Sequence, residues 1–479
     1  MHTEITSPSQ TEIPIEEVEF ATSASPLHTA RLFSWKGELY RAIPEAGLPR
    51  WQQLHDSGLL QELIDQKWFV ETTATDYRLD GAALVLKHRR IPFPHLSVRV
   101  EFSSTKVCHD SLLDLNIRLS RGKGLATTDV HPWNLVFDGT NPCSSTWFVR
   151  PAGTDSPGRF IFNQFRTQFW YPLQLMAKGQ GRLARSPMQE SSSRSRKDEL
   201  PGYHYLWRRC WLKLAKRCGH TRIGRVAQKL ARLNRFHLQR QPATPSWIKE
   251  LERWKRRVER LRFPNQKTFW SHYYADDFPD HQQPASWSLK QRTVAEVLQE
   301  LKPATLHDLA GNSGWYSLLA QQLGAKVICS DNDDLALNQL FERQSHDPSI
   351  SLAFLNLVNP IGPHGTIDAH GKRLYTSVDD RLQAECLLAL GLTHHLVFTE
   401  MFDFHFIFGL LSQFTKQNLI VEFVSREDDY VKTWWNESYS WYSLEEFCRI
   451  AREYFENVEV RDSSPAGRFL VVCNQKRNR

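Results

Sequence analysis

The last third of the chain predicts an α/β fold in which a mainly parallel sheet carries helices on both faces. From Ser288 onward, short apolar segments alternate with segments of helical periodicity, as parallel strands joined by crossover helices require. A glycine-containing turn follows the first apolar segment, and an acidic residue follows the second. The last two apolar segments, Val458–Val460 and Phe469–Cys473, predict a closing pair of strands.

The elements of this part are expected in a regular order. Right-handed crossovers bring the carboxyl ends of parallel strands to one edge of the sheet, where ligands bind. Helices are expected at Ser288–Leu301, Gly314–Leu323, Leu335–Arg343, Phe404–Thr415 and Leu444–Phe455, and strands at Thr305–Ala310, Ala325–Ser330, Ser351–Leu355, Cys386–Leu392 and Leu419–Val424.

The turn after the first strand reads Asp308-Leu309-Ala310-Gly311-Asn312-Ser313-Gly314. Gly311 and Gly314 allow the backbone to approach a ligand closely, and the next helix offers its amide groups to an anionic group. After the second strand comes Asp331, a position where a carboxylate can accept both hydroxyls of a ribose. Asp331 can equally cap the next helix. A dinucleotide-binding turn is the alternative, although the spacing G-x-G-x-x-G is absent.

These residues resemble the first motif of class I S-adenosylmethionine-dependent methyltransferases, which have a Rossmann-like fold. The resemblance extends from about Ser286 to Asn474. It implies a seven-stranded, mainly parallel sheet and S-adenosylmethionine as the cofactor. Ala310 and Asn312 stand where the family often has glycine, but alanine is small and asparagine tolerates positive φ. The cofactor-binding residues that the resemblance implies are Asp308, Ala310, Gly311, Asn312, Gly314, Asp331, Asn332 and Asn356.

Three residues are candidates for catalysis. His394 and His395 follow the strand Cys386–Leu392, and this strand end faces the transferred methyl group in the family. One of them is predicted to take a proton from the acceptor, since two adjacent residues do not both point into one site. A core histidine or a helix cap is the alternative. Glu422, a carboxylate within an apolar strand, either lines the acceptor pocket or pairs with an arginine, namely Arg373, Arg381 or Arg426. No further ligand stands at metal spacing, so no metal is predicted.

The N-terminal half contains the pattern D-x-x-x-x-N at Asp129 and Asn134. It resembles the catalytic loop of kinases and aminoglycoside phosphotransferases, where these residues position the acceptor and magnesium. The segment Cys143–Phe148 lacks the second metal-binding acid, and no glycine-rich loop precedes it. A degenerate kinase-like α+β domain is therefore predicted, with active phosphotransfer as the alternative. Together the two halves resemble a bacterial two-part methyltransferase family that includes nodulation-associated methyltransferases.

Positive charge is concentrated in one segment. The chain has a formal charge of +7, yet Pro201–Arg262 alone holds 18 Lys or Arg against three acids. Helices are expected at Tyr203–Arg240 and from about Ser246. Their basic residues are either a solvated helix face or a surface for nucleic acid or another acidic partner. A non-catalytic binding protein that uses these helices is thus the alternative function. A nucleic-acid methyltransferase is not favoured, because no N-P-P-Y or D-P-P-Y segment follows Cys386–Leu392.

Four parts are expected along the chain. They are a flexible tail (1–26), the kinase-like domain (27–180), a basic linker and helical connector (181–285) and the methyltransferase domain (286–479). The start of the chain does not resemble a secretory signal, no apolar run is long enough for a membrane span, and the eight cysteines are scattered. These features predict a soluble, cytoplasmic protein with reduced thiols. The expected partner is a small-molecule or glycoconjugate methyl acceptor, whose identity and acceptor atom the sequence leaves open, as it does the oligomeric state.

Overall fold

The structure is a computed structural model of the 479-residue chain. It describes residues 11–21, 30–96, 99–127, 131–144, 149–151, 164–189, 203–237, 244–264, 268, 270, 280–344, 347, 349–358 and 377–477. The contacts divide the chain into two compact units. The first comprises Met1–Ser104, Leu135–Ser145 and Asn265–Arg479, and the second comprises Thr105–Asn134 and Thr146–Pro264. Each unit combines segments that are distant in sequence, and the four contiguous parts expected above stay a prediction.

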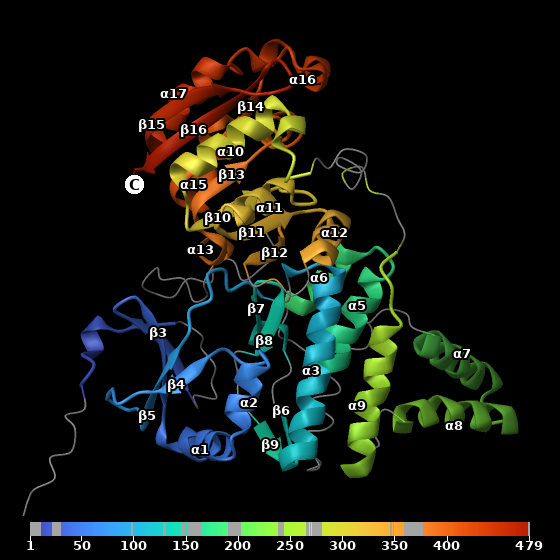
Figure 1. The fold of residues 1–479 in the computed structure, drawn as a ribbon. Coiled ribbons are helices and arrows are strands. Elements are labelled where there is room, and N and C mark those ends of the chain that lie inside the picture. Colours follow the sequence, from blue (N-terminus) through green and yellow to red (C-terminus); the bar gives the residue numbers. More distant parts are fainter. Residues whose placement is uncertain are drawn as a thin grey trace, which may run out of the picture. The chain divides into compact units, whose positions relative to one another are not determined.

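The C-terminal part of the first unit is built on a seven-stranded sheet with the order β12-β11-β10-β13-β14-β16-β15 (Figure 1). Strands β12 to β14 of this order run parallel, and β16 is antiparallel to both β14 and β15. The prediction of an α/β fold with a closing pair of strands is therefore confirmed, and this pair is antiparallel. The strands are β10 (Thr305–Leu309), β11 (Lys326–Asp331), β12 (Ile350–Phe354), β13 (Ala384–Ala389), β14 (Thr415–Val424), β15 (Phe455–Asp462) and β16 (Arg468–Lys476).

The helices of this part contact one another in two groups, with α10 against α11, and α15 against both α14 and α17. The first of them starts with a capping box, in which Ser288 and Gln291 each accept the other's backbone N–H through their side chains. The first amide groups of a helix have no acceptor within the helix, and this capping box gives two of the N–H groups at this end a side-chain acceptor. The helices are α10 (Leu289–Leu301), α11 (Trp315–Gln322), α12 (Asp334–Gln344), α13 (Val378–Leu382), α14 (Thr393–Phe398), α15 (Phe404–Gln413), α16 (Asp429–Trp434) and α17 (Leu444–Tyr454), with short 3-10 turns η6 (Pro284–Ser286) and η7 (Glu437–Tyr439).

The predicted strand Cys386–Leu392 is the main boundary that the structure corrects. Strand β13 ends at Ala389, and the chain turns at Gly391, whose φ is +61°. Helix α14 then begins at Thr393, so the two histidines lie on a short helix and not on a strand end. An apolar run continues through this turn, and apolarity alone does not distinguish a buried strand from a buried helix.

The N-terminal part of the first unit contains a five-stranded antiparallel sheet with the order β1-β2-β3-β5-β4. Phe33, Trp35 and Tyr40 form its aromatic core. A separate hairpin joins β7 to β8. The elements are η1 (Ile15–Glu17), β1 (Glu19–Phe20), β2 (Arg31–Trp35), β3 (Glu38–Ile43), η2 (Glu45–Gly47), α1 (Leu48–Asp56), α2 (Leu59–Asp65), β4 (Thr72–Ala74), β5 (Leu84–His88), β7 (Leu135–Asp138) and β8 (Asn141–Ser144).

The second unit is mainly helical. The single helix predicted over Tyr203–Arg240 is wrong, because the chain turns at Gly219, with φ of +49°, and forms two helices. The next helix begins at Thr244, two residues before the predicted cap Ser246. The elements are α3 (Phe102–Lys123), which starts in the first unit, β6 (Leu125–Thr127), η4 (Pro132–Asn134), β9 (Val149–Pro151), the π-helix η5 (Phe165–Trp170), α5 (Tyr171–Met176), α6 (Gly181–Gln189), α7 (Tyr203–Cys218), α8 (Arg222–His237) and α9 (Thr244–Glu259).

Helix α9 shows how part of the basic segment is used. Trp247, Leu251, Trp254 and Val258 are buried, at steps of three or four residues that place them on one helix face. The Trp247 indole N–H donates to Ser120 Oγ on α3 over 2.9 Å. Basic residues occupy other faces of the helix, as in the ion pair of Lys255 with Asp114 at 2.7 Å. For α9, this arrangement supports the interpretation of a connecting helix with a solvated charged face.

Two further predictions concern membrane-spanning segments and disulfide bonds. None of the helices in the described part combines the length and apolar character that crossing a membrane would take. No cysteine forms a disulfide, and six of the eight are buried.

Replacing Trp247 by alanine should destabilise the second unit. The variant loses a buried indole and its hydrogen bond to Ser120, so we expect the free energy of unfolding to fall by about 3 to 5 kcal/mol. Urea denaturation followed by circular dichroism measures this change. The control Arg256→Ala, on the exposed side of the same helix, should change the value by no more than about 0.5 kcal/mol. Equal effects of the two variants would contradict the burial of Trp247.

Candidate functional site

The predicted site residues follow the carboxyl ends of neighbouring strands. The strand register pairs Leu309 with both Ser330 and Ala389, and pairs Asp331 with Phe354. The turn after β10, the end of β11 and the segment after β13 therefore lie along one edge of the sheet. In open α/β sheets this edge is the one that binds ligands.

The turn between β10 and α11 is tightly folded. Ala310, Asn312 and Gly314 have φ of +58°, +53° and +80°, a region that only small or short polar residues adopt readily. A Cβ atom on Gly314 would lie 2.4 Å from Leu340 Cδ2, and one on Gly311 would lie 2.6 Å from Asp308 Oδ2. Glycine at these two positions therefore permits a close approach between the turn and its surroundings.

Two buried carboxylates hold this turn. Asp308 accepts a hydrogen bond from Ser317 Oγ at 2.7 Å, and Asp331 accepts the backbone N–H of Asn312 at 2.8 Å and of Asp333 at 2.9 Å. Burial raises the pKa of both carboxyls to about 6. The backbone N–H groups of Asn312, Asp333 and Asn332 donate to this carboxylate, whose two oxygens offer about four lone-pair sites, so accepting capacity is left for a ligand hydroxyl.

Helix capping was the alternative role for Asp331, but Asp333 is the residue that caps helix α12. Asp333 Oδ1 accepts the backbone N–H groups of Leu335 and Ala336 at the start of α12. Asn332 is exposed between the two acids. Asn356 follows β12, and its side-chain oxygen accepts the N–H of Val358 at 3.1 Å. All eight predicted cofactor residues thus lie at the carboxyl ends of β10, β11 and β12, and their contact with a cofactor stays a prediction.

The two histidines on α14 are close together. Their ring centroids lie 4.2 Å apart, whereas their adjacency in the sequence predicted different directions. His394 is only 4% exposed, and burial together with the charges of His395, Arg468 and Lys290 lowers its pKa to about 3. Its Nδ1 atom has no hydrogen-bond partner in the described part of the chain. His394 is therefore a neutral imidazole at physiological pH. The His395 ring packs edge-on against the Trp270 ring, and the two ring centroids lie 5.2 Å apart.

Glu422 is fully buried, and its partner is a lysine. Lys290 Nζ on α10 lies 2.8 Å from Glu422 Oε2, which also accepts the backbone N–H of Gly391 at 2.7 Å. One carboxylate thus links α10, the turn after β13 and strand β14. Lys290 was missed by sequence reasoning because it lies 132 residues from Glu422 and no local pattern marks it.

The arginines expected beside Glu422 lie elsewhere. Arg381 donates to the carbonyl oxygen of Pro94 at 2.8 Å, and Arg426 pairs with Glu427 at 3.1 Å. Arg373 lies outside the described residues. The predicted pairing of Glu422 with an arginine is therefore wrong for Arg381 and Arg426.

The kinase-like pattern is described only in part. Asp129 lies outside the described residues, and Asn134 ends the turn η4 directly before β7. In the described part of the chain, no group of three His, Cys, Asp or Glu side chains could hold a metal ion.

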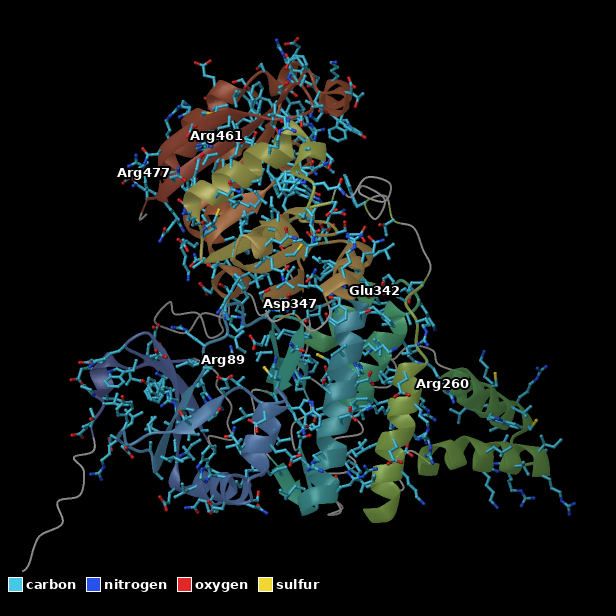
Figure 2. All side chains as sticks on the ribbon, viewed as in Figure 1. Arg89, Arg260, Glu342, Asp347, Arg461 and Arg477 are labelled. Atoms are coloured by element: carbon cyan, nitrogen blue, oxygen red, sulfur yellow. The ribbon has the colours of Figure 1, made fainter. Side chains whose placement is uncertain are left out.

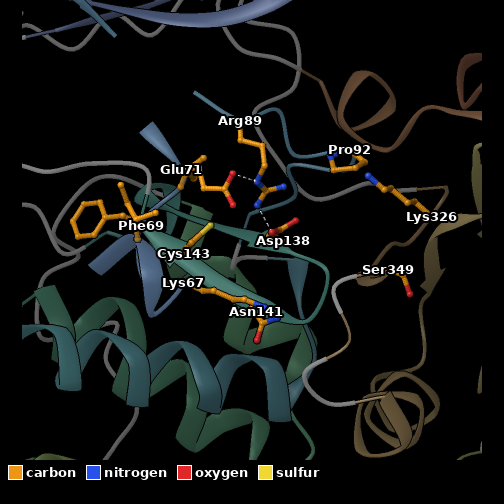
Figure 3. Close-up of a pocket in the computed structure, with 12 residues that line it drawn as sticks. Lys67, Phe69, Glu71, Arg89, Pro92, Asp138, Asn141, Cys143, Lys326 and Ser349 are labelled. Atoms are coloured by element: carbon orange, nitrogen blue, oxygen red, sulfur yellow. Dashed lines mark hydrogen bonds and ion pairs between the residues drawn. The ribbon is translucent and has the colours of Figure 1, made fainter. Parts of the chain in front are cut away.

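A pocket of about 380 Å³ in the first unit lies away from these residues (Figure 3). Arg89 stands on its wall and pairs with Glu71 at 3.4 Å and with Asp138. Lys326, the first residue of β11, also lines it. The pocket is therefore near the amino end of that strand, and none of the predicted site residues lines it.

The chain is similar to a known nodulation protein. It is 25% identical over 398 residues to Nodulation protein NoeA of Rhizobium meliloti (strain 1021), and the match covers 80% of this chain and 78% of that protein. This similarity confirms the resemblance to a family with nodulation-associated members. No model of a protein family matches the sequence.

Similar solved structures include methyltransferases. The bifunctional kinase-methyltransferase WbdD is 17% identical, with a TM-score of 0.29, and the match covers 45% of each chain, so this chain spans about half of that length. Magnesium protoporphyrin IX methyltransferase (ChlM) of Synechocystis PCC 6803 is 13% identical, with a TM-score of 0.27, and the match covers 48% of this chain and 91% of that chain.

Gly311→Ala should disturb the turn beside β10. The added methyl group would meet Asp308 Oδ2 at 2.6 Å and Cys329 Sγ at 2.7 Å. Overpacking of this kind lowers the free energy of unfolding by about 1 to 3 kcal/mol, which thermal denaturation detects as a lower midpoint. Gly122→Ala on α3, where nothing lies within 4 Å of the added atom, is the control and should not destabilise the protein. An unchanged midpoint for Gly311→Ala would refute the close approach.

Proposed function

We propose that the chain is an S-adenosylmethionine-dependent methyltransferase. The observation that carries the proposal is the turn Asp308–Gly314 beside Asp331 at the carboxyl edge of a seven-stranded sheet. An antiparallel strand β16 between β14 and β15 agrees with the closing hairpin that the resemblance to class I methyltransferases implies. Similarity to a nodulation protein adds support at the level of the whole chain.

The residues at this edge fit the cofactor. The unshared lone pairs of Asp331 can accept the two ribose hydroxyls, and the N-terminus of α11 suits the carboxylate of the methionine part. Gly311 and Gly314 let the turn pack directly against the side chains of Asp308, Cys329 and Leu340, which holds its backbone at this edge. Asn356 follows β12, where the family faces adenine. When bound, S-adenosylmethionine supplies a methyl group on a positively charged sulfur, which is already electrophilic.

The chain's own contribution is to position groups and to take up a proton. His394 is neutral, and its Nδ1 atom can accept the proton of an acceptor hydroxyl or amine. Glu422 holds the backbone of Gly391 and is itself held by Lys290, so this pair fixes the turn that leads into α14. Correct alignment of acceptor and methyl group accounts for most of the catalysis that such a transfer needs.

We propose a small-molecule or glycoconjugate acceptor and a degenerate kinase-like N-terminal domain. The acceptor is inferred from the resemblance to the nodulation-associated family, and the similarity to Nodulation protein NoeA supports that resemblance. The alternative of a non-catalytic protein that binds nucleic acid through the basic helices has less support, since Lys255 and Arg253 of α9 pair with acids of the chain itself.

Asp331→Ala should abolish cofactor binding. The variant removes a carboxylate that we expect to make two charge-assisted hydrogen bonds to ribose, so affinity for S-adenosylhomocysteine should fall by about 100-fold or more. Calorimetric titration measures this, with ATP–magnesium and NAD as control ligands. Asp403→Ala, which removes a helix-capping acid of α15, is the matched variant and should keep the affinity. Unchanged binding in Asp331→Ala would exclude the ribose assignment.

Affinity should also depend on pH. Burial raises the pKa of Asp331 from 3.8 to about 6 in the ligand-free protein, so its carboxylate form increases as the pH rises from 5 to 7. Binding of S-adenosylhomocysteine should strengthen over the same interval. The sign for stability is opposite, because protonation of a group with a raised pKa stabilises the fold below 3.8 and this contribution is lost as the pH rises through about 6. Binding that weakens from pH 5 to pH 7 would argue against ribose recognition by this carboxylate.

Lys290→Met should destabilise the protein strongly. Glu422 is then buried without its counter-ion, which costs about 3 to 5 kcal/mol of unfolding free energy. The double variant Lys290→Met with Glu422→Gln should recover much of this loss, because no unpaired charge remains. Arg461→Met, which breaks the more exposed pair with Glu300, should cost no more than about 1 kcal/mol (Figure 2). Urea denaturation of the wild type, these three variants and the single variant Glu422→Gln tests the set. Additive effects of Lys290→Met and Glu422→Gln would show that the ion pair has no structural role.

A further inference from the structure

Helices α7 and α8 form a hairpin whose inner side is lined by small residues. The two helices pack extensively on each other, and no other described element contacts either of them to a similar extent. Ala215 on α7 and Ala227 on α8 are buried, and a Cβ atom on Gly224 would collide with the carbonyl oxygen of Gly219 in the turn. Small side chains let two helices approach closely, so the hairpin closes without burying its larger apolar residues.

The larger apolar residues of the hairpin face outward. Ile223 and Val226 on α8 are 61% and 55% exposed, and Leu212 and Leu214 on α7 are exposed as well. Ile223 and Val226 lie three residues apart, and the half-buried Leu230 follows four residues later, so the three form an apolar stripe along α8. An amphipathic helix of a globular protein normally buries such a stripe, whereas α8 presents it to solvent.

A basic stripe runs beside the apolar stripe. Arg222, Arg225 and Lys229 are exposed and lie at steps of three and four residues, which places them on one face of α8. Since successive residues of a helix are rotated by about 100°, the apolar stripe lies between this basic stripe and the buried seam of Gly224 and Ala227. Basic and aliphatic side chains are therefore exposed next to each other along the same helix.

The hairpin contains no acid that could neutralise its charges. The sequence has neither Asp nor Glu from Pro201 to Lys249. On α9, by contrast, Arg253 and Lys255 pair with acids, and the apolar residues of that helix are buried. The positive charge of the hairpin is thus left for an external anionic partner. Within Cys210–Leu230 the exposed basic residues are Lys213, Lys216, Arg217, Arg222, Arg225 and Lys229.

The combination of the two stripes fits the surface of an anionic bilayer. Interfacial helices place aliphatic side chains at the boundary of headgroups and acyl chains, and their Lys and Arg side chains reach the lipid phosphates. A nucleic acid would use the charges but leave Ile223 and Val226 in water, and single strands are bound mainly by aromatic stacking. A second copy of the chain would bring two basic stripes together, and like charges repel. Charge complementarity and apolar exposure together therefore favour lipid.

We propose that the α7–α8 hairpin binds the surface of a bilayer that contains anionic lipid. Helix α8 lies along the surface, with Ile223 and Val226 inserted between the lipids and the basic stripe at their phosphates. Attraction of each basic residue to an anionic leaflet adds to the transfer of the aliphatic side chains out of water. The hairpin belongs to the second unit and the proposed cofactor site to the first, so failure of one proposal does not decide the other.

The test is flotation of the full-length protein with lipid vesicles in a density gradient. Vesicles of equal parts phosphatidylcholine and phosphatidylglycerol should bind the protein, and vesicles of phosphatidylcholine alone should bind it at least about tenfold more weakly. Binding to the anionic vesicles should weaken as the salt concentration rises, because salt screens the basic stripe. Absence of binding to the anionic vesicles, or equal binding to both kinds, would overturn the proposal.

The apolar stripe is tested with its charges intact. Ile223→Ser combined with Val226→Ser should weaken binding to the anionic vesicles at least about tenfold, because the transfer of two aliphatic side chains out of water is lost. Both residues are exposed in the free protein, so circular dichroism should show an unchanged fold. Leu323→Ser, at an exposed leucine of the first unit, is the control and should bind like the wild type. Wild-type affinity of the double variant would refute insertion into lipid.

The basic stripe is tested by a triple variant, Arg222→Gln, Arg225→Gln and Lys229→Gln. Affinity for the anionic vesicles should fall by about 100-fold, since each basic residue near an anionic surface contributes about tenfold or somewhat less. The matched control removes three exposed charges from the neighbouring segment and should weaken binding by no more than about threefold. An equal loss in both triple variants would show that the hairpin is not the binding surface. The control carries Lys249→Gln, Arg256→Gln and Arg260→Gln.

Two other occupants are outcomes that would overturn the proposal. Tighter binding of a single-stranded DNA oligonucleotide than of the anionic vesicles at equal phosphate concentration, lost in the basic triple variant, would identify a nucleic-acid surface. A dimer in analytical ultracentrifugation that dissociates in the variant of Ile223 and Val226 would identify a second copy of the chain as the partner.

Discussion

The turn after β10 depends on two carboxylates that are buried with almost no access to water. Asp308 and Asp331 are 2% and 7% exposed. Asp308 accepts a hydrogen bond from Ser317 on α11, and Asp331 accepts one from Asn312 in the turn. A buried carboxylate is costly unless donors surround it, so the backbone amide of Asn312 and the hydroxyl of Ser317 are held in place. The positive φ angles of the turn persist because these bonds and the packing of Gly314 on Leu340 over-determine it.

A second buried charge joins parts of the chain that the turn does not reach. Lys290 and Glu422 come from α10 and β14, and the Glu422 carboxylate also binds the backbone of Gly391. Because side-chain exposures are 12% and 0%, solvent screens this pair little, unlike the ion pairs on the surface. Helix α10 is thereby tied to the turn at Gly391, which leads into the helix α14 with the two histidines. The position of the Gly391 turn and the lowered pKa of His394 thus both depend on Lys290, which lies more than a hundred residues away in the sequence.

Positive charge has different consequences in different places. The segment Pro201–Arg262 is rich in lysine and arginine, yet on α9 the basic side chains are exposed or paired with acids, and the buried face is apolar. Arg99 is inconspicuous in the sequence, yet it is only 3% exposed, and the charge of Asp379 acts on it. Local charge density therefore indicates solubility and surface character, whereas the tertiary structure decides which charges are buried beside an opposite charge.

The alternation of strands and helices could be predicted from the sequence because each element has its own period, and the turn Asp308–Gly314 and Asp331 could be predicted because their pattern is local. The sequence was silent on contacts between distant segments. It did not determine that Glu422 pairs with Lys290, that His394 and His395 lie on a helix with their rings in contact, or that Arg381 faces Pro94. Each of these depends on contacts between distant segments. Their partners are chosen by packing of the whole sheet and its helices, which no short window of residues contains.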